Sequence, residues 1–422
     1  MLALTPAPSL TKLQLARQVA HWSIAVTELE DLSRLASPEG WHRLERYLGV
    51  ALKRTLSETV ARLARQTTVL RAELAAAETA AELDRLRLEI IGFRQRYLAA
   101  EMVLDFYADA INTRTNENLG SYLRACDALA MRSMADVLVP LGHRVPAVLT
   151  WVDKGLGAAV LKADLPLWDG RSISPVAAIK IVRHNLQRPT ALIHETGHQV
   201  AHILNWTDEL AAVLRRGLAR APAVAAMWAE WASEIAADAF AFAHTGYASV
   251  AALCDVLAGD SDWVMRWLDG DPHPVSYLRV LLGKQMCTRH YGAGPWDALA
   301  RAWIQSYPVT RARGESAGAI EASLPLLPEI VELIFDTPMA AFGRRSLAAV
   351  IDPARVRPDA LAELERSAGA SLTTSDHWIR TESLRLLALH GLRAAVDPDQ
   401  AVAMLEQQQR WMLRLGALVV VD

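Results

Sequence analysis

Cysteine is scarce in this chain, which has only three cysteines among its 422 residues. Cys126, Cys254 and Cys287 are odd in number and far apart, so they predict neither a disulfide framework nor a cysteine-based metal site. We interpret them as small hydrophobic side chains of a protein in a reducing compartment. The expected location is therefore the cytoplasm.

Long hydrophobic runs are also lacking. The most apolar stretch, residues 221–243, contains Glu230, Glu234 and Asp238, and three carboxylates near the middle of one helix would be costly in lipid. The first residues lack the basic stretch followed by an apolar one that marks a secretory signal peptide. We therefore expect neither a membrane span nor a signal peptide.

Neither sign of charge is in large excess. The sequence has 44 basic and 47 acidic residues, for a net charge of −3, so no basic surface for nucleic acid is expected. Lysine is rare, and nearly all basic residues are arginine. Together with the abundant alanine, this composition is typical of a GC-rich bacterial genome.

Helical periodicity dominates the first part of the sequence. Apolar residues recur there at steps of three and four, with a change of phase after Ala77. The residues of this pattern are Leu56, Val60, Leu63, Thr67, Leu70, Leu74, Leu83, Leu86, Ile90, Phe93 and Tyr97. The pattern predicts a coiled coil or a long helical hairpin. Because long helical arms frequently bind partners, these helices are also a candidate surface for another protein.

Between residues 145 and 183 the helical period fades, and short apolar runs alternate with turn residues. The predicted strands are 147–153, 157–163 and 174–182, and the turn signals between them lie at 154–157 and 169–170. Pro189 then suits the first turn of a helix. The remainder of the chain is again helical and is interrupted by prolines.

The predicted fold class is therefore mainly α (α+β). We expect a helical N-terminal domain over residues 1–140 and a domain with a small sheet over residues 141–310. A helical C-terminal region is expected over residues 311–422.

The helix expected after Pro189 contains the sequence His194-Glu195-Thr196-Gly197-His198. Residues four apart lie on one helix face, about 6 Å apart along the axis, so the two imidazoles can converge on one ion. Glu195 lies beside them, where it can reach a metal-bound water. Taken alone, this segment leaves open an ordinary pair of histidines on an amphipathic helix.

A catalytic zinc site needs a third protein ligand. His202 lies a further turn along the same helix, about 12 Å from His194, so we expect it to pack or to support the ligands rather than to bind metal. Glu234 is the better candidate, because an isolated carboxylate in its alanine-rich stretch would be expensive to bury. Asp238 would then accept a hydrogen bond from the second ring nitrogen of His194. A solvated charged face is the alternative for this helix.

These motifs resemble those of the gluzincin metallopeptidases. In the M48 family, which includes the CAAX prenyl protease and a heat-shock protease of bacterial inner membranes, HExxH is followed by ExxxD and by His-Pro with an arginine six residues past that histidine. All three occur here in order, from His194 to Arg279. The resemblance implies a zincin-like catalytic domain, although many family members have membrane helices and the flanking helical regions here match nothing in that family.

The resemblance also implies roles for the motif residues. His194, His198 and Glu234 would be the zinc ligands. Glu195 would be the catalytic base, and Asp238 would support His194.

Three further assignments concern the substrate. By the same resemblance, His273 and Arg279 would face the substrate and steady the oxyanion or the peptide backbone beyond it. Tyr277 is another candidate for the oxyanion contact. The strand over 174–182 would be the edge strand on which an extended peptide lies.

The sequence thus predicts a soluble zinc metallopeptidase that cleaves a peptide or protein substrate. Two other functions stay open. One is a helical binding or assembly protein with a structural zinc site, against which the intact Glu195 argues. The other is a metallohydrolase of a non-peptide amide, which the sequence does not distinguish from a peptidase.

Overall fold

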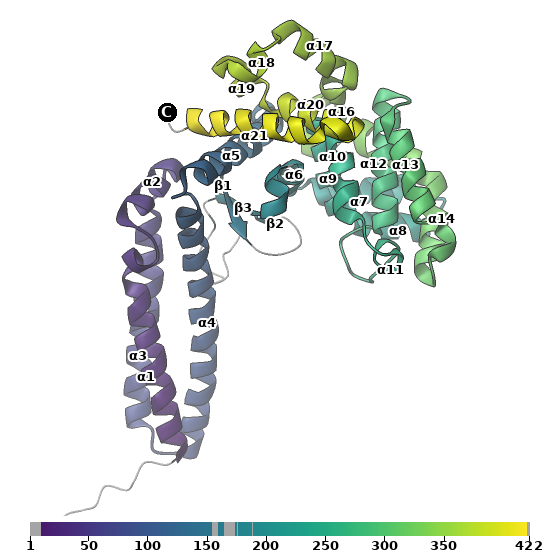
Figure 1. Ribbon diagram of the computed structural model, residues 1–422. Coiled ribbons are helices and arrows are strands. Elements are labelled where there is room, and N and C mark those ends of the chain that lie inside the picture. Colours follow the sequence, from purple (N-terminus) through teal and green to yellow (C-terminus); the bar gives the residue numbers. More distant parts are fainter. Residues whose placement is uncertain (1–9, 154–158, 164–173, 175, 188, 420–422) are drawn as a thin grey trace, which may run out of the picture. The chain divides into compact units, whose positions relative to one another are not determined.

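The computed structural model describes residues 10–153, 159–163, 174, 176–187 and 189–419. The described chain is mostly helical with one small three-stranded sheet, so the predicted mainly α (α+β) fold class is confirmed (Figure 1). It divides into two compact units, and the second contains Glu117–Ala163 and Val176–Asp422. Within the described part, no helix combines the length and apolar character that a membrane span requires.

The first unit contains the long helices predicted from the apolar periodicity. Its helices are α1 (Leu10–Glu30), α2 (Pro38–Leu48), α3 (Leu52–Ala76) and α4 (Ala80–Thr113). The predicted periodic residues are all buried, and α1, α3 and α4 pack along one another. Thr79 and Glu82 form a capping box at the start of α4, which explains the change of phase after Ala77.

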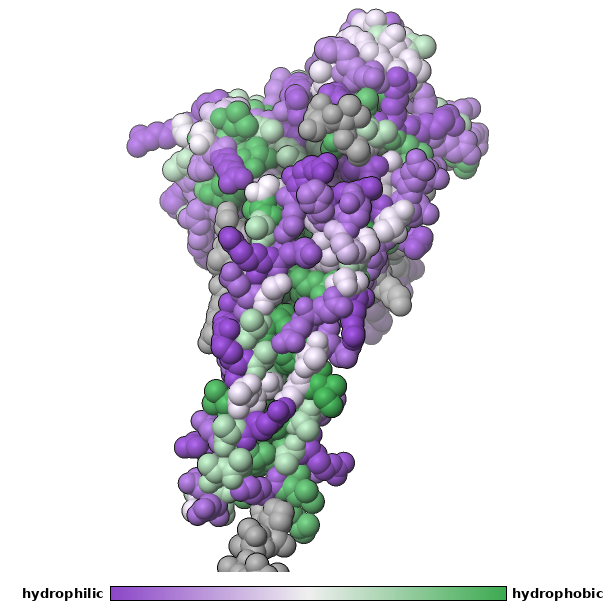
Figure 2. Space-filling view, turned by 90° about the vertical axis from the view of Figure 1, so that its left-hand side faces the viewer, coloured by the Kyte–Doolittle hydropathy of each residue, from purple (hydrophilic) through white to green (hydrophobic). Residues whose placement is uncertain are grey.

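Apolar side chains also remain exposed on this unit. The lower helices in Figure 2 carry hydrophobic residues between hydrophilic ones along their outer face. Those that are exposed include Leu13, Ile24, Val69, Leu88, Ile91, Leu98 and Met102. The protein-binding role of these helices stays a prediction.

The second unit contains the sheet and the other helices. Its first elements are α5 (Glu117–Leu138), β1 (Ala147–Asp153), β2 (Ala159–Leu161), β3 (Val176–Val182), α6 (Thr190–Ile203), α7 (Trp206–Gly217), α8 (Pro222–Glu230), α9 (Ala232–Thr245), α10 (Tyr247–Leu257), α11 (Ser261–Val264) and α12 (Ser276–Tyr291). They are followed by α13 (Pro295–Ser306), α14 (Glu315–Ser323), α15 (Leu327–Asp336), α16 (Leu347–Val350), α17 (Pro358–Ala368), α18 (Ser371–Thr374), α19 (Asp376–Thr381), α20 (Ser383–Val396) and α21 (Ala401–Leu418).

The sheet has the strand order β1-β3-β2, with β3 parallel to β1 and antiparallel to β2. Strand β1 has the predicted bounds, whereas the predicted turns and the start of the second strand lie outside the described residues. The prediction that 174–182 forms an edge strand is wrong, because β3 is hydrogen-bonded on both sides. Its apolar run, buried along nearly its whole length, is the pattern of a central strand.

The division into units differs from the three segments expected from the sequence. Helix α5 belongs to the second unit, where it packs against α6, β1 and the C-terminal helix α21. Asp127 on α5 accepts hydrogen bonds from the backbone N–H and the hydroxyl of Thr150 on β1. The C-terminal helices therefore share one core with the sheet, which the linear order of the sequence does not reveal.

Helices α6 and α9 approach each other very closely, and this contact positions the site. A Cβ atom on Gly197 would lie 2.8 Å from the Cα of Ala237 and 3.1 Å from the Cβ of Phe240. Glycine on one helix and alanine on the other therefore let the two backbones nearly touch. The faces that meet contain the histidines of α6 and the carboxylates of α9.

Candidate metal centre

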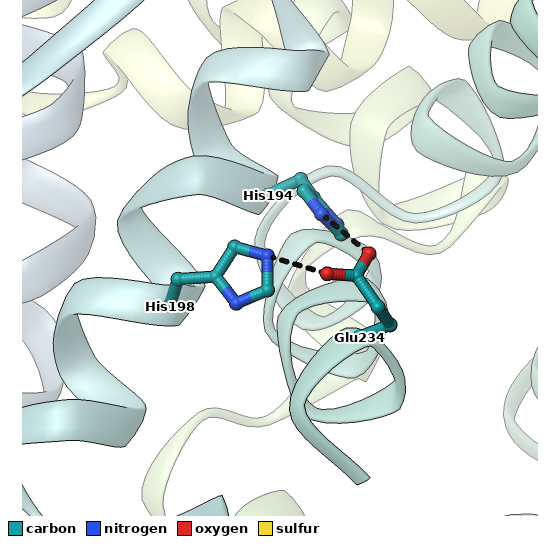
Figure 3. Close-up of side chains that lie close together, drawn as sticks. All are labelled: His194, His198 and Glu234. Atoms are coloured by element: carbon teal, nitrogen blue, oxygen red, sulfur yellow. Dashed lines mark ion pairs between the residues drawn. The ribbon is translucent and has the colours of Figure 1, made fainter. Parts of the chain in front are cut away.

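His194, His198 and Glu234 form the candidate metal-binding group. The two histidines point from successive turns of α6 toward the carboxylate of Glu234 on α9 (Figure 3). Nε2 of His198 lies 3.1 Å from Oε1 of Glu234, and Nε2 of His194 lies 3.4 Å from Oε2. One ligand atom from each residue lies within 4.8 Å of the others, so the predicted triad is brought together.

The spacing and charge of this group fit a divalent cation. Ligand atoms arranged tetrahedrally around zinc at about 2.0–2.1 Å are about 3.3 Å apart, close to the two distances to Glu234. Glu195, Glu234 and Asp238 bring three carboxylates into the same buried region. Within the described part of the chain, Arg279 is the only buried arginine or lysine. A divalent cation would balance the two remaining negative charges.

Asp238 lies behind His194, as predicted. Its Oδ1 is 2.9 Å from Nδ1 of His194, although the ring N–H is not directed at this oxygen with regular hydrogen-bond geometry. The distance is short enough that a small rotation of the imidazole would complete the bond. A carboxylate at Nδ1 leaves Nε2 as the ring atom that faces Glu234 and the metal position.

Arg279 lines the cavity beside the metal-binding group and pairs with two carboxylates. Its Nε donates to Oδ2 of Asp238 at 2.6 Å, and its Nη2 donates to Oδ1 at 2.9 Å. Nη2 also donates to Oε2 of Glu234 at 3.0 Å. A guanidinium is a planar fork that matches a carboxylate in this way. Arg279 therefore fixes the two acidic side chains of α9, and its contact with a substrate stays a prediction.

The pKa values of the ligands reflect these contacts. Burial opposes the charged form of His194, but Asp238 and Glu234 outweigh it and raise the pKa of His194 to about 10. Burial likewise opposes ionisation of Glu234, yet the two imidazoles and Arg279 hold the pKa of its carboxyl far below the usual range. Without metal the site thus retains a proton on His194 opposite an ionised Glu234, and a cation would replace that proton.

Glu195 is buried and directly follows His194 on α6. Burial has the largest effect on its carboxyl and raises the pKa, and the charge of Glu234 raises this pKa further. The charges of His194, His198 and Arg279 act in the opposite direction. A carboxylate with a raised pKa accepts protons more readily near neutral pH, which suits a general base. The side chain lines the same cavity as His194 and Glu234.

His273 lies on the cavity wall, where the sequence predicted it. Its Nε2 is 3.8 Å from Oε2 of Glu234, and its side chain is 58% exposed. Asp271 holds the histidine, because Oδ1 lies 2.6 Å from Nδ1 and accepts the backbone N–H at 3.0 Å. The flanking residues Pro272 and Pro274 stiffen this loop.

Two further positions from the sequence lie outside the cavity wall. Tyr277 is 1% exposed and is not among the residues that line the cavity, so its oxyanion contact stays a prediction without support from the structure. His202 is exposed and is not part of the triad, in agreement with its exclusion as a ligand, although it does not pack in the core.

The structure adds residues that the sequence reasoning missed. The hydroxyl of Ser233 lies 3.3 Å from Nδ1 of His198 and thus supports the second histidine as Asp238 supports the first. Lys162 directly follows β2 and is half-buried. Burial lowers the pKa of its ammonium group, and the charges of Glu234 and Glu195 oppose this decrease. Asp271 had a local signal, since an aspartate often accepts the N–H two residues later, but Lys162 had none.

A cavity of about 930 Å³ adjoins the metal-binding group. One end contains His194, Glu195, Glu234, Asp238, His273 and Arg279. The other end extends between α10 and α12, where most lining residues are apolar and the exposed residues Asp255 and Asp260 are acidic. Two members of the metal-binding group, His194 and Glu234, therefore lie in the wall of a cavity large enough for a ligand of several residues.

Comparison of the chain with family models, with curated proteins and with solved structures gave no match. The site therefore has to be interpreted from its own geometry and from the motifs of the sequence.

Proposed function

We propose that this protein is a zinc-dependent hydrolase and that it cleaves peptide bonds. The observation that carries the proposal is the buried carboxylate of Glu195 beside a His194-His198-Glu234 triad, in the wall of a cavity. Two imidazoles and one carboxylate are a ligand set typical of catalytic zinc. A purely structural site needs neither a neighbouring base nor a cavity.

Each residue has a definite part in the proposed reaction. When bound, zinc supplies Lewis acidity that polarises a carbonyl group and acidifies water. The Glu195 carboxylate accepts a proton from the attacking water and passes it to the leaving nitrogen. Nε2 of His273, held toward the cavity by Asp271, stabilises negative charge on the carbonyl oxygen. Arg279 and Asp238 keep Glu234 and His194 in position.

The decisive experiment replaces Glu195 with glutamine, which keeps the shape and removes the base. The zinc-loaded protein should hydrolyse an unfolded protein such as casein, and Glu195→Gln should lower kcat by about 10²- to 10⁴-fold. Zinc content, measured by elemental analysis, should stay at one ion per chain in the variant. Glu230→Gln is the matched control, because Glu230 is exposed on α8, and it should behave like the wild type.

The outcomes separate the alternatives. Full activity in Glu195→Gln would refute the proposed chemistry, and loss of zinc in that variant would make Glu195 a structural residue. A zinc-loaded wild type that hydrolyses small amides but no peptide would favour the non-peptide hydrolase.

A further inference from the structure

The cavity continues from the metal-binding group along three helices, and the character of its wall changes with distance. On α9, Glu234 and Asp238 are followed on the same face by Ala241 and Phe242. Glu234 and Phe242 are eight residues apart, which is about 12 Å along the helix. The charged end of the cavity thus passes into an apolar end within the length of a few residues of extended peptide.

Helix α12 shows the same order. Arg279 at the charged end is followed at helical spacing by Leu282 and Met286, and all three line the cavity. These side chains face one direction, because residues three, four and seven apart share a helix face. The apolar end is therefore formed by the continuation of the faces that hold the site.

Helix α10 forms the opposite wall. Val250, Leu253 and Leu257 line the cavity at steps of three and four. A Cβ atom on Gly283 of α12 would lie 3.0 Å from Cγ1 of Val250, so the two helices are in close contact at this point. We call the region lined by Phe242, Val250, Leu253, Leu257, Leu282 and Met286 the apolar arm.

We propose that the apolar arm binds a large aliphatic or aromatic side chain of the substrate, next to the bond that is cleaved. This inference rests on the proposed function, because it assigns a substrate to the same site. An acidic side chain would lose its water in the arm without gaining an ionic partner, because the charged residues near the arm, Asp255 and Asp260, are themselves acidic and lie at exposed positions. A glycine would leave the arm unfilled and would gain no apolar contact.

Binding probes test the arm without requiring catalysis. Leucine, phenylalanine and glycine hydroxamates offer the same metal-binding group and differ only in the side chain. Isothermal titration of the zinc-loaded protein should show the leucine and phenylalanine probes binding about 10- to 200-fold more tightly than the glycine probe, the range expected when a whole side chain of this size is buried. Equal affinities, or no binding of any probe, would overturn the proposal.

Variants of Leu253, which is half-buried in the arm, test whether the preference among the probes arises there. Leu253→Asp should abolish the preference for the leucine probe and favour lysine hydroxamate, while Leu253→Ala should favour phenylalanine over leucine. Ile304→Asp is the matched control on the exposed face of α13. Unchanged probe preferences in both Leu253 variants, with zinc content intact, would place the selective pocket elsewhere.

A cleavage assay then separates this inference from the proposed function. The wild type is incubated with a mixture of synthetic peptides, and the cut sites are determined by mass spectrometry. Cleavage next to leucine, phenylalanine or methionine is expected. Cleavage without an apolar preference at any position would contradict the role of the apolar arm but not the proposed peptidase function. If no peptide is cut while the leucine probe still binds more tightly than glycine, the peptidase proposal fails and the apolar arm stands.

Discussion

The ligands of the metal centre are held by other polar side chains rather than by the backbone alone. Asp238 lies against His194, Ser233 lies against His198, and Arg279 donates to Glu234. Such outer contacts orient metal ligands and set their protonation state. The affinity of this group for a metal ion would therefore depend on residues that do not touch the ion.

Zinc binding should depend steeply on pH because of His194. The two neighbouring carboxylates outweigh burial and raise the pKa of this imidazole to about 10 in the metal-free protein. Below that pH the ring binds a proton, which zinc must displace, so the apparent affinity should fall about tenfold for each unit of pH between 8 and 6. Competition titrations with a chromogenic chelator measure this slope.

The matched variant for this prediction is Asp238→Asn, which removes one of the charges that raise the pKa. The slope should then weaken at the alkaline end of the range. An affinity that is independent of pH between 6 and 8 in the wild type would mean that His194 is already neutral.

Asp271 should act on the rate through His273. Asp271→Ala removes the acceptor of both His273 contacts, so the imidazole should turn away from the cavity and kcat should fall about tenfold or more. KM and zinc content should change little, because His273 is not a metal ligand. Asp269→Ala, at an exposed position two residues earlier, is the control and should leave kcat unchanged. Loss of zinc in Asp271→Ala would contradict the assigned role.

At the scale of elements, the site depends on the distance between α6 and α9. Both histidines come from α6 and Glu234 comes from α9, so a shift between these helices changes the ligand distances directly. The close approach of Gly197 to Ala237 sets that distance. The glycine of the HETGH sequence therefore has a packing role that its position between two ligands does not suggest.

Gly197→Ala tests this dependence. The added methyl group would meet the backbone of Ala237, so we expect a loss of about 1–3 kcal/mol in stability and a weaker affinity for zinc. Gly318→Ala on α14 is the control, since its new Cβ meets nothing within 4 Å, and it should be neutral or stabilising. Thermal unfolding and zinc titration measure the two effects, and wild-type behaviour of Gly197→Ala would contradict the close contact.

At the scale of the whole molecule, the metal should stabilise the second unit. Zinc bound to the triad would link α6 to α9, and at a free concentration 100 times its Kd it would contribute about 2.7 kcal/mol. For a domain of this size roughly 2–4 °C of Tm corresponds to each kcal/mol, so removing zinc should lower Tm by roughly 5–10 °C. Differential scanning calorimetry with and without a chelator measures the shift. Glu234→Ala should show the lower Tm in both conditions, and an unchanged wild-type Tm after chelation would contradict the site.

Local patterns in the sequence were enough to predict most helices and the core of the site. The periodic residues of α3 and α4 are buried as expected, and strand β1 has its predicted bounds. The pairing of His194 with His198 follows from helical spacing alone. Glu234 was found because an acidic residue in an alanine-rich helix needs a partner. These inferences depend on neighbours within a few turns, which the sequence contains directly.

Only the tertiary structure decided the arrangements that depend on distant segments. The central place of β3, the membership of α5 in the second unit and the pairing of Arg279 with Asp238 all join residues far apart in the chain. Lys162 comes near Glu234 because of how the second unit packs, and its surrounding sequence has no motif. The periodicity of one helix predicts which face is buried but not which element that face packs against. Such contacts therefore cannot be derived from the local sequence pattern.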